Sequence, residues 1–127
     1  MGCDEWLYED LRSAGIQPFP CPTVASQLAG SQYYHLAHTS PVSLLGYMMV
    51  LEGFPLPLDV VDELELAYGR ELLRTVRYHA EHDSDHSREL HSIVDGLSQS
   101  DFAIVRQIAL EVADQLTNAA QQLPRSV

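Results

Sequence analysis

The chain has 127 residues, a formal net charge of −11 at pH 7 and 46% hydrophobic residues, so we expect one domain with a single modest core. The negative charge argues against binding to nucleic acids or to anionic membrane surfaces. Every basic residue is an arginine, which excludes a Schiff-base lysine, a pyridoxal-phosphate anchor and the lysine of a P-loop.

The cysteine pattern and the N-terminal segment indicate the cellular compartment in which the protein is expected. Cys3 and Cys21 form neither a CxxC pair nor a zinc-binding spacing, so a reducing cytoplasm is expected. The N-terminal segment is acidic and has no apolar core, unlike a signal peptide. The longest apolar run, residues 44–51, is too short to span a bilayer. We therefore expect a cytoplasmic protein that is not embedded in a membrane.

No segment has the alternation typical of a strand, and the first half of the chain predicts three helices. The first covers residues 3–14 and ends at Gly15. The second covers about residues 23–38. The third has Ser40 as its N-cap and Pro41 at its first position, and it is apolar nearly all round, so we expect it to be buried.

Three further helices are predicted in the second half. The fourth is capped by Asp59 and ends before Gly69. The fifth covers about residues 71–96, with a kink expected near residues 83–84. The last begins at residue 100 or 101 and runs to about residue 123 as an amphipathic packing helix. The fold class is therefore all-α, a helical bundle.

The fifth helix carries His79, Asp83 and His86 at i, i+4 and i+7. This spacing places them within about 60° on one helix face. Two imidazoles and one carboxylate are the ligand set of a non-haem iron site. Val76 and Leu90 make the same face apolar at both ends. The alternative is a solvated polar helix in which Asp83 caps a new segment.

Glu52 is the second candidate ligand. It ends the third helix, on the same stripe as Leu45, Met48 and Met49. Burying a lone carboxylate there is costly, and the helix dipole disfavours an anion at a C-terminus. A cation near Glu52, or a protonated carboxyl, would remove this cost. The alternative is a frayed last turn that points Glu52 to solvent.

The remaining histidines are weaker candidates. His82 and His86 are also four residues apart and could form a zinc-type pair, but the HExxH motif is absent because position 83 is Asp. We expect His82 to lie beside the ligands or in solvent, with a role as an extra ligand left open. His35, His38 and His91 are expected at the surface.

Three other side chains are candidates for contact with a substrate or with the ligands. The hydroxyl of Tyr47 needs a partner if the ring is buried. Arg74 and Arg77, one turn before the histidines, could orient a substrate carboxylate. Pairing of these arginines with Glu71 or Glu81 is the alternative.

Residues 33–53, YYHLAHTSPVSLLGYMMVLEG, followed by residues 74–86, RTVRYHAEHDSDH, resemble the haem-oxygenase-like di-iron oxidases. These iron-containing redox enzymes are relatives of the TenA and PqqC folds. The resemblance covers about residues 4–120. It implies a haem-oxygenase-like bundle in which ferrous iron reacts with dioxygen and oxidises small substrates, often amino acids or fatty acids. In this resemblance, the family's ligands match Glu52, His79, Asp83 and His86.

The chain departs from this family near its start. The first core helix of the family supplies a Glu and a His, whereas here Cys3 stands at the His position and the Glu has no counterpart before Met1. The resemblance therefore implies a short form without the N-terminal ligand region. Its second iron site would be lost, or rebuilt with Cys3 or with ligands from another subunit. Exposed apolar surface would be covered by a homodimer or a complementing subunit.

Three functions follow as expectations. The first is a non-haem iron oxidase or oxygenase of specialised biosynthesis. It would form a single helical metal-binding domain over residues 1–127, holding one or two Fe(II) ions, with manganese as an alternative. The second is a non-catalytic remnant or split-enzyme subunit that acts as a ligand-binding or protein-interaction module. The third is a metal-free member that uses Glu52 and the histidines for acid–base chemistry, as in TenA-like hydrolases.

Overall fold

A computed structural model describes residues 2–17 and 22–121, and within them it contains helices and no strand. The helices are α1 (Cys3–Ser13), α2 (Pro22–His38), α3 (Ser43–Leu51), α4 (Leu58–Tyr68), α5 (Arg74–Asp95) and α6 (Gln99–Gln121). The prediction of an all-α bundle is confirmed. None of the helices in these two ranges has the length and hydropathy needed to cross a membrane.

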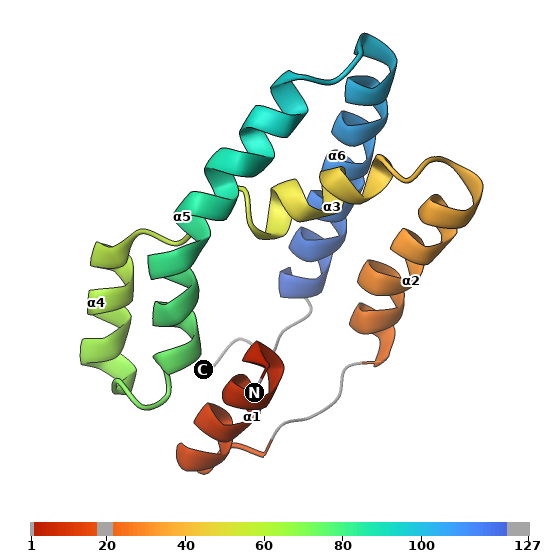
Figure 1. Ribbon diagram of the computed structural model, residues 1–127. Coiled ribbons are helices and arrows are strands. Elements are labelled where there is room, and N and C mark those ends of the chain that lie inside the picture. The colour runs from red at the N-terminus through yellow and green to blue at the C-terminus, as the bar shows by residue number, and fades with distance from the viewer. Residues whose placement is uncertain (1, 18–21, 122–127) are drawn as a thin grey trace.

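Three helices contact α3, and the other two pack on one of these three (Figure 1). The two long helices α5 and α6 meet at the short connection between them and then diverge, and α3 lies between them and contacts both. The helix α2 packs on α3 and α6, while α1 and α4 each pack on α5. The helix α3 is therefore central, but the burial predicted for it is not observed. Its buried residues are Ser43 and Gly46, whereas Leu44 and Leu51 are exposed, because the neighbouring helices cover only part of its surface.

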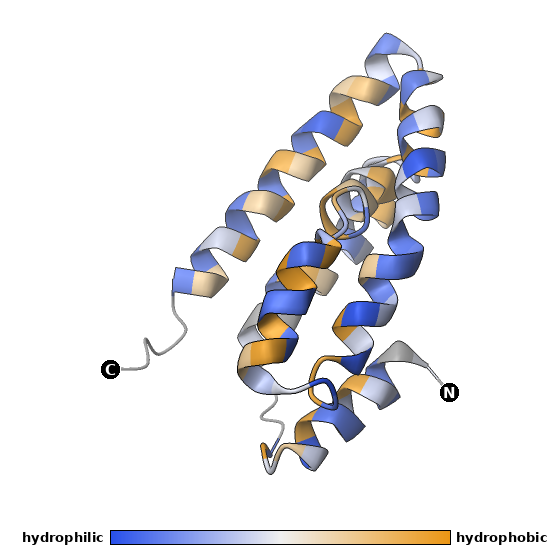
Figure 2. Cartoon of the chain, turned by 90° about the vertical axis from the view of Figure 1, so that its left-hand side faces the viewer, coloured by the Kyte–Doolittle hydropathy of each residue, from blue (hydrophilic) through white to orange (hydrophobic). Residues whose placement is uncertain are grey.

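The helices α3 and α6 approach each other closely where they cross at Gly46. A Cβ atom at this position would lie 2.5 Å from the carbonyl oxygen of Val105 and 2.8 Å from Cβ of Ile108. On α6, Val105, Ile108 and Val112 are buried, and their spacing puts them on one face. Alternating blue and orange bands along α6 in Figure 2 reflect this amphipathic pattern.

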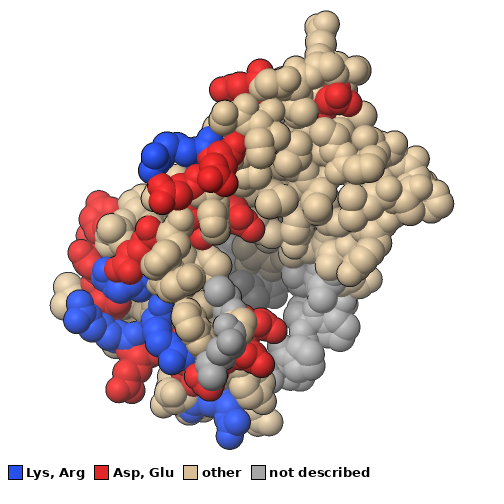
Figure 3. Space-filling model, viewed as in Figure 1, with Lys and Arg blue, Asp and Glu red and all other residues tan. Residues whose placement is uncertain are grey.

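Charge is distributed unevenly along the chain. No Asp, Glu, Lys or Arg occurs between Arg12 and Glu52, so α2 and α3 carry no such side chain. Figure 3 shows red and blue side chains gathered over the lower left, where α1, α4 and the first half of α5 lie. The surface over α2 and α3, on the right, is tan. In this view, one side of the molecule is charged and the side over α2 and α3 is not.

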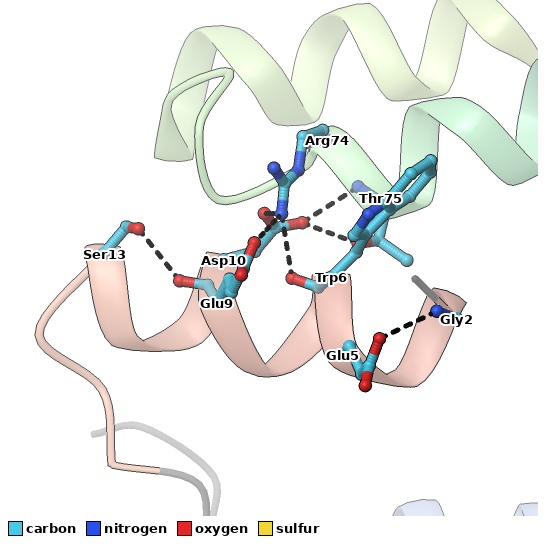
Figure 4. Close-up of polar contacts among 8 residues, drawn as sticks. All are labelled: Gly2, Glu5, Trp6, Glu9, Asp10, Ser13, Arg74 and Thr75. Atoms are coloured by element: carbon cyan, nitrogen blue, oxygen red, sulfur yellow. Dashed lines mark hydrogen bonds and ion pairs between the residues drawn. The ribbon is translucent and has the colours of Figure 1, made fainter.

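A buried carboxylate joins α1 to the start of α5 (Figure 4). Asp10 accepts hydrogen bonds from the backbone N–H of Thr75 (2.9 Å) and from the hydroxyl of Thr75 (2.7 Å). Arg74 lies 2.8 Å from the other oxygen of Asp10 and also donates to Glu9 (3.1 Å). Because the first turn of a helix has unsatisfied N–H groups, Asp10 caps α5 from a different helix.

The start of the third helix was predicted two residues too early. Residues 40–42 form a turn in which the N–H of Ser43 donates to the carbonyl of Ser40 (3.0 Å), and α3 begins at Ser43. The hydroxyl of Ser43 also donates to this carbonyl (2.5 Å). With its carbonyl occupied, Ser40 begins a tighter turn of the 3₁₀ type instead of the first α-helical turn. Its hydroxyl accepts from the N–H of Val42 (3.3 Å).

The predicted start of the fourth helix is also corrected. Pro57 is the N-cap of α4, and Asp59 lies inside the first turn. There the negative charge of Asp59 interacts favourably with the positive end of the helix dipole.

The last two helices also differ from the prediction. The fifth helix begins at Arg74 instead of Glu71, because residues 70–73 form a turn, and it continues without a break through residues 83–84. The last helix begins at Gln99, since Ser98 accepts the N–H of Asp101 (3.1 Å) as a cap would. The predicted end near residue 123 falls outside the described residues.

We expect Gly46→Ala to lower the free energy of unfolding by about 1–3 kcal/mol, because the added methyl group has no room between two backbones. Urea denaturation measures this change. The matched control is Gly30→Ala in α2, where an added Cβ atom would have no neighbour within 4 Å. That variant should be stabilised by about 0.5–1 kcal/mol. Equal effects of the two substitutions would contradict the described crossing.

Candidate metal centre

Glu52 lies immediately after the last residue of α3, and the connection that follows is tied to α5. Its N–H donates to the carbonyl of Met48 (2.8 Å). A Cβ atom at Gly53 would overlap the carbonyl of Met49, so only glycine fits the next position. The carbonyl of Gly53 accepts a hydrogen bond from the hydroxyl of Ser87 on α5 (2.8 Å). This bond holds the end of α3 beside His86.

The four predicted ligands form one continuous cluster. His79 Nδ1 lies 3.1 Å from Asp83 Oδ2, and His86 Nδ1 lies 3.9 Å from Asp83 Oδ1. His86 Nδ1 is also 3.8 Å from Glu52 Oε2. Asp83 is 12% exposed, whereas Glu52, His79 and His86 are 40%, 45% and 59% exposed. Glu52 is thus partly solvated, and the high cost of burial inferred from its sequence position does not apply.

These side chains match a metal site in chemistry but do not converge. Among the described residues, no three His, Cys, Asp or Glu side chains are arranged to hold one ion. Nδ1 of His79 lies within hydrogen-bond distance of both oxygens of Asp83, at 3.3 Å and 3.1 Å. Because both imidazoles of the cluster are about half exposed, their rings can turn without displacing core neighbours. Convergence on an ion requires this rotation.

The other candidate ligands lie away from the cluster, or their side chains are not among those that the structure describes. The ring of His82 stacks on Tyr78, with centroids 4.1 Å apart, and its Nδ1 lies 2.7 Å from the Tyr78 carbonyl oxygen. The side chain of Cys3 is not among those described. His35 Nε2 lies 3.3 Å from a carboxylate oxygen of Glu111 on α6.

The three predicted substrate contacts have other surroundings. Tyr47 lines a pocket of about 230 Å³ formed by residues of α2 and α3 and by none of the four cluster residues. Arg74 pairs with Asp10 and Glu9, as described above. Arg77 donates to Glu65 (2.5 Å) and to Asp62, and lies 3.6 Å from Glu81. Both guanidinium groups are therefore engaged in ion pairs, but the partners differ from those expected from the sequence. Of Glu71 and Glu81, only Glu81 is a partner in the described part of the chain, at 3.6 Å from Arg77.

A groove beside the cluster is the feature that sequence reasoning missed. It has a volume of about 560 Å³ and includes His79 and Asp83 in its lining. Leu7 comes from α1, and Phe54 and Leu56 come from the connection between α3 and α4. Pro55 and Pro57 in this connection are typical of a turn, but no local signal in the sequence places this turn next to α1 and α5.

Comparisons with models of protein families, with curated proteins and with solved structures returned no match to the chain. The resemblance to haem-oxygenase-like di-iron oxidases therefore stays a prediction that depends on the residues themselves.

We expect Ser87→Ala to lower the free energy of unfolding by about 1 kcal/mol, because the Gly53 carbonyl loses its partner on α5. Amide hydrogen exchange at residues 53–56 should become faster. The control is Ser92→Ala, at an exposed position on the same helix, which should change neither quantity. Unchanged exchange in Ser87→Ala would mean that the hydroxyl does not hold the end of α3.

The ion pair of Glu65 predicts a dependence of stability on pH. The hydrogen bond from Arg77 and, to a lesser extent, the one from Arg70 hold the pKa of Glu65 below its ordinary value of 4.5. Stabilisation from a depressed carboxyl pKa is complete above the unfolded-state pKa and is lost as pH falls through the folded-state pKa. Glu65→Gln should therefore lower Tm at neutral pH and much less in acid.

Thermal unfolding at the two pH values checks this expectation. The matched control is Glu63→Gln, which removes the same charge from an exposed position of α4 and should change Tm little at either pH. An equal loss of Tm for Glu65→Gln at both pH values would show that ionisation of Glu65 does not contribute to the stability of the fold.

Proposed function

We propose that this protein is a non-haem iron-dependent oxidase or oxygenase that uses dioxygen to oxidise a small molecule in a biosynthetic pathway. One observation carries the proposal. Glu52 comes from the end of α3 and the other three residues from α5, and all four lie side by side. The helical spacing already brings the three residues of α5 together, whereas the approach of Glu52 to His86 (3.8 Å) joins two helices.

The donor set suits ferrous iron. Glu52, His79, Asp83 and His86 would hold one ion, and two imidazoles with carboxylates leave positions open for other molecules. Bound ferrous iron supplies the capacity to bind and reduce dioxygen. Manganese is the alternative metal, because carboxylate-rich sites accept it too.

Binding of an ion would rearrange the contact between His79 and Asp83. Nδ1 of His79 lies 3.1 Å from Asp83 Oδ2. The two nitrogens of an imidazole point to opposite sides of the ring, so Asp83 cannot accept from Nδ1 and also bind an ion that Nε2 of the same ring holds. In the proposed complex this hydrogen bond is therefore exchanged for bonds to the ion, and the more exposed ring of His79 turns beside Asp83, the most buried of the four residues.

A second candidate function is favoured by the uncharged side of the molecule. In this candidate the chain is a non-catalytic remnant or a split-enzyme subunit, completed by a second copy or by another protein. On α2, Tyr33 is 75% exposed and Tyr34 is also exposed, although no charged residue is near them in sequence. Two copies with a net charge of −11 each would repel one another least through this face.

Anaerobic titration with ferrous iron tests the proposal. We expect about one tightly bound iron or more per chain by elemental analysis, and oxygen consumption with a suitable substrate. His79→Ala and His86→Ala should each weaken iron binding by more than about tenfold, because each removes a donor. The matched control is His91→Ala, at an exposed position on the same helix, which should bind iron as the wild type does.

Two other outcomes contradict the proposed ligand set or function. If iron binding survives His86→Ala and is lost in His82→Ala, the site is built around His82. If the folded chain binds no iron, the second candidate is favoured. Sedimentation equilibrium then tests that candidate, because Tyr33→Glu should dissociate an assembly formed through the uncharged face.

A further inference from the structure

The groove beside the cluster has an unusual lining for an exposed surface. Leu7, Leu51, Phe54 and Leu56 are all exposed large apolar side chains, with Phe54 at 73%, and all four line this groove. Such side chains are normally scattered singly over a protein surface, whereas a contiguous set marks a binding site. The groove volume of about 560 Å³ lies in the range typical of sites for small molecules.

The charged groups of the groove have one sign. Its lining includes two carboxylates, Asp4 and Asp83, and no arginine. Asp83 interacts with His79, as described above. Among the described residues, Asp4 makes no ion pair with a basic side chain, and the arginines nearest in sequence to the groove-lining residues of α5, Arg74 and Arg77, pair with other carboxylates.

From this arrangement we propose that the groove binds a primary amine with an apolar body. The ammonium group pairs with Asp4, and the apolar body lies against Leu7, Phe54 and Leu56. In the metal-free chain, a carboxylate ligand would meet two negative groups and no arginine here, at a cost in electrostatic energy. The net charge of −11 also raises the local concentration of cations over that of anions.

This inference deepens the proposed function by naming the class of its substrate. Its chemical consequence rests on that proposal, because His79 and Asp83 are shared by the groove and the proposed iron site. Binding of the amine itself does not require the metal. The two proposals can therefore fail separately.

Isothermal titration of the metal-free full chain with three eight-carbon probes tests the inference. The probes are n-octylamine, 1-octanol and octanoate, at concentrations below self-association and at neutral pH. We expect n-octylamine to bind about tenfold more tightly than 1-octanol, which corresponds to one charge-assisted hydrogen bond. Octanoate should bind more weakly than either of the other two.

Two pairs of variants locate the binding. Phe54→Ala should weaken n-octylamine binding by about tenfold, whereas Leu110→Ala, at an exposed position on α6 that does not line the groove, should not. Asp4→Asn should reduce the affinity for n-octylamine to that for 1-octanol. Asp95→Asn removes the same charge from an exposed position at the end of α5 and should preserve the difference.

Three results would overturn the inference. The first is no binding of n-octylamine by the folded chain, and the second is binding of octanoate as tight as that of n-octylamine. The third is a dimer in sedimentation equilibrium that Phe54→Ala dissociates, which would assign the groove to a second copy. Because the chain is metal-free in this experiment, none of these results decides the outcome of the iron titration.

Discussion

At Gly46 the backbone of α3 lies directly against the backbone of α6, with no side chain between them. This approach sets the distance and direction of α3, which in turn contacts α2, α5 and α6. Glu52 follows less than two turns later, so its position depends on the same crossing. The hydrogen bond from Ser87 to the Gly53 carbonyl then fixes the end of α3 against α5. The candidate metal centre is thus a product of core packing.

The second scaffold of the site is α5, which is held at several points along its length. Asp10 caps its first turn from α1, and Arg77 joins it to α4 through Glu65. Both contacts lie on the half of the helix that precedes Asp83. Side chains on an anchored helix are placed more accurately than those on a loop. The exposed imidazoles, in contrast, keep the freedom to turn that convergence on an ion requires.

Much of this arrangement could be predicted from the sequence because its signals are local. Apolar periods placed all six helices, and the i, i+4, i+7 spacing put His79, Asp83 and His86 on one face. The helix boundaries that were predicted wrongly lie where other hydrogen bonds compete with those of the α-helix. One example is the bond from the Ser43 hydroxyl to the Ser40 carbonyl. The cap from Asp10 and the groove beside the cluster are each formed by residues that are distant in sequence. No periodic pattern predicts such contacts.

The proposed activity requires that Glu52, His79, Asp83 and His86 meet at one metal ion. A crystal grown anaerobically with ferrous iron, measured on both sides of the iron absorption edge, tests this directly. We expect one anomalous difference peak between the end of α3 and the middle of α5, within bonding distance of Glu52 and of side chains from α5. A well-ordered chain without a peak there, or with its peak at His82 or His35, would contradict this expectation.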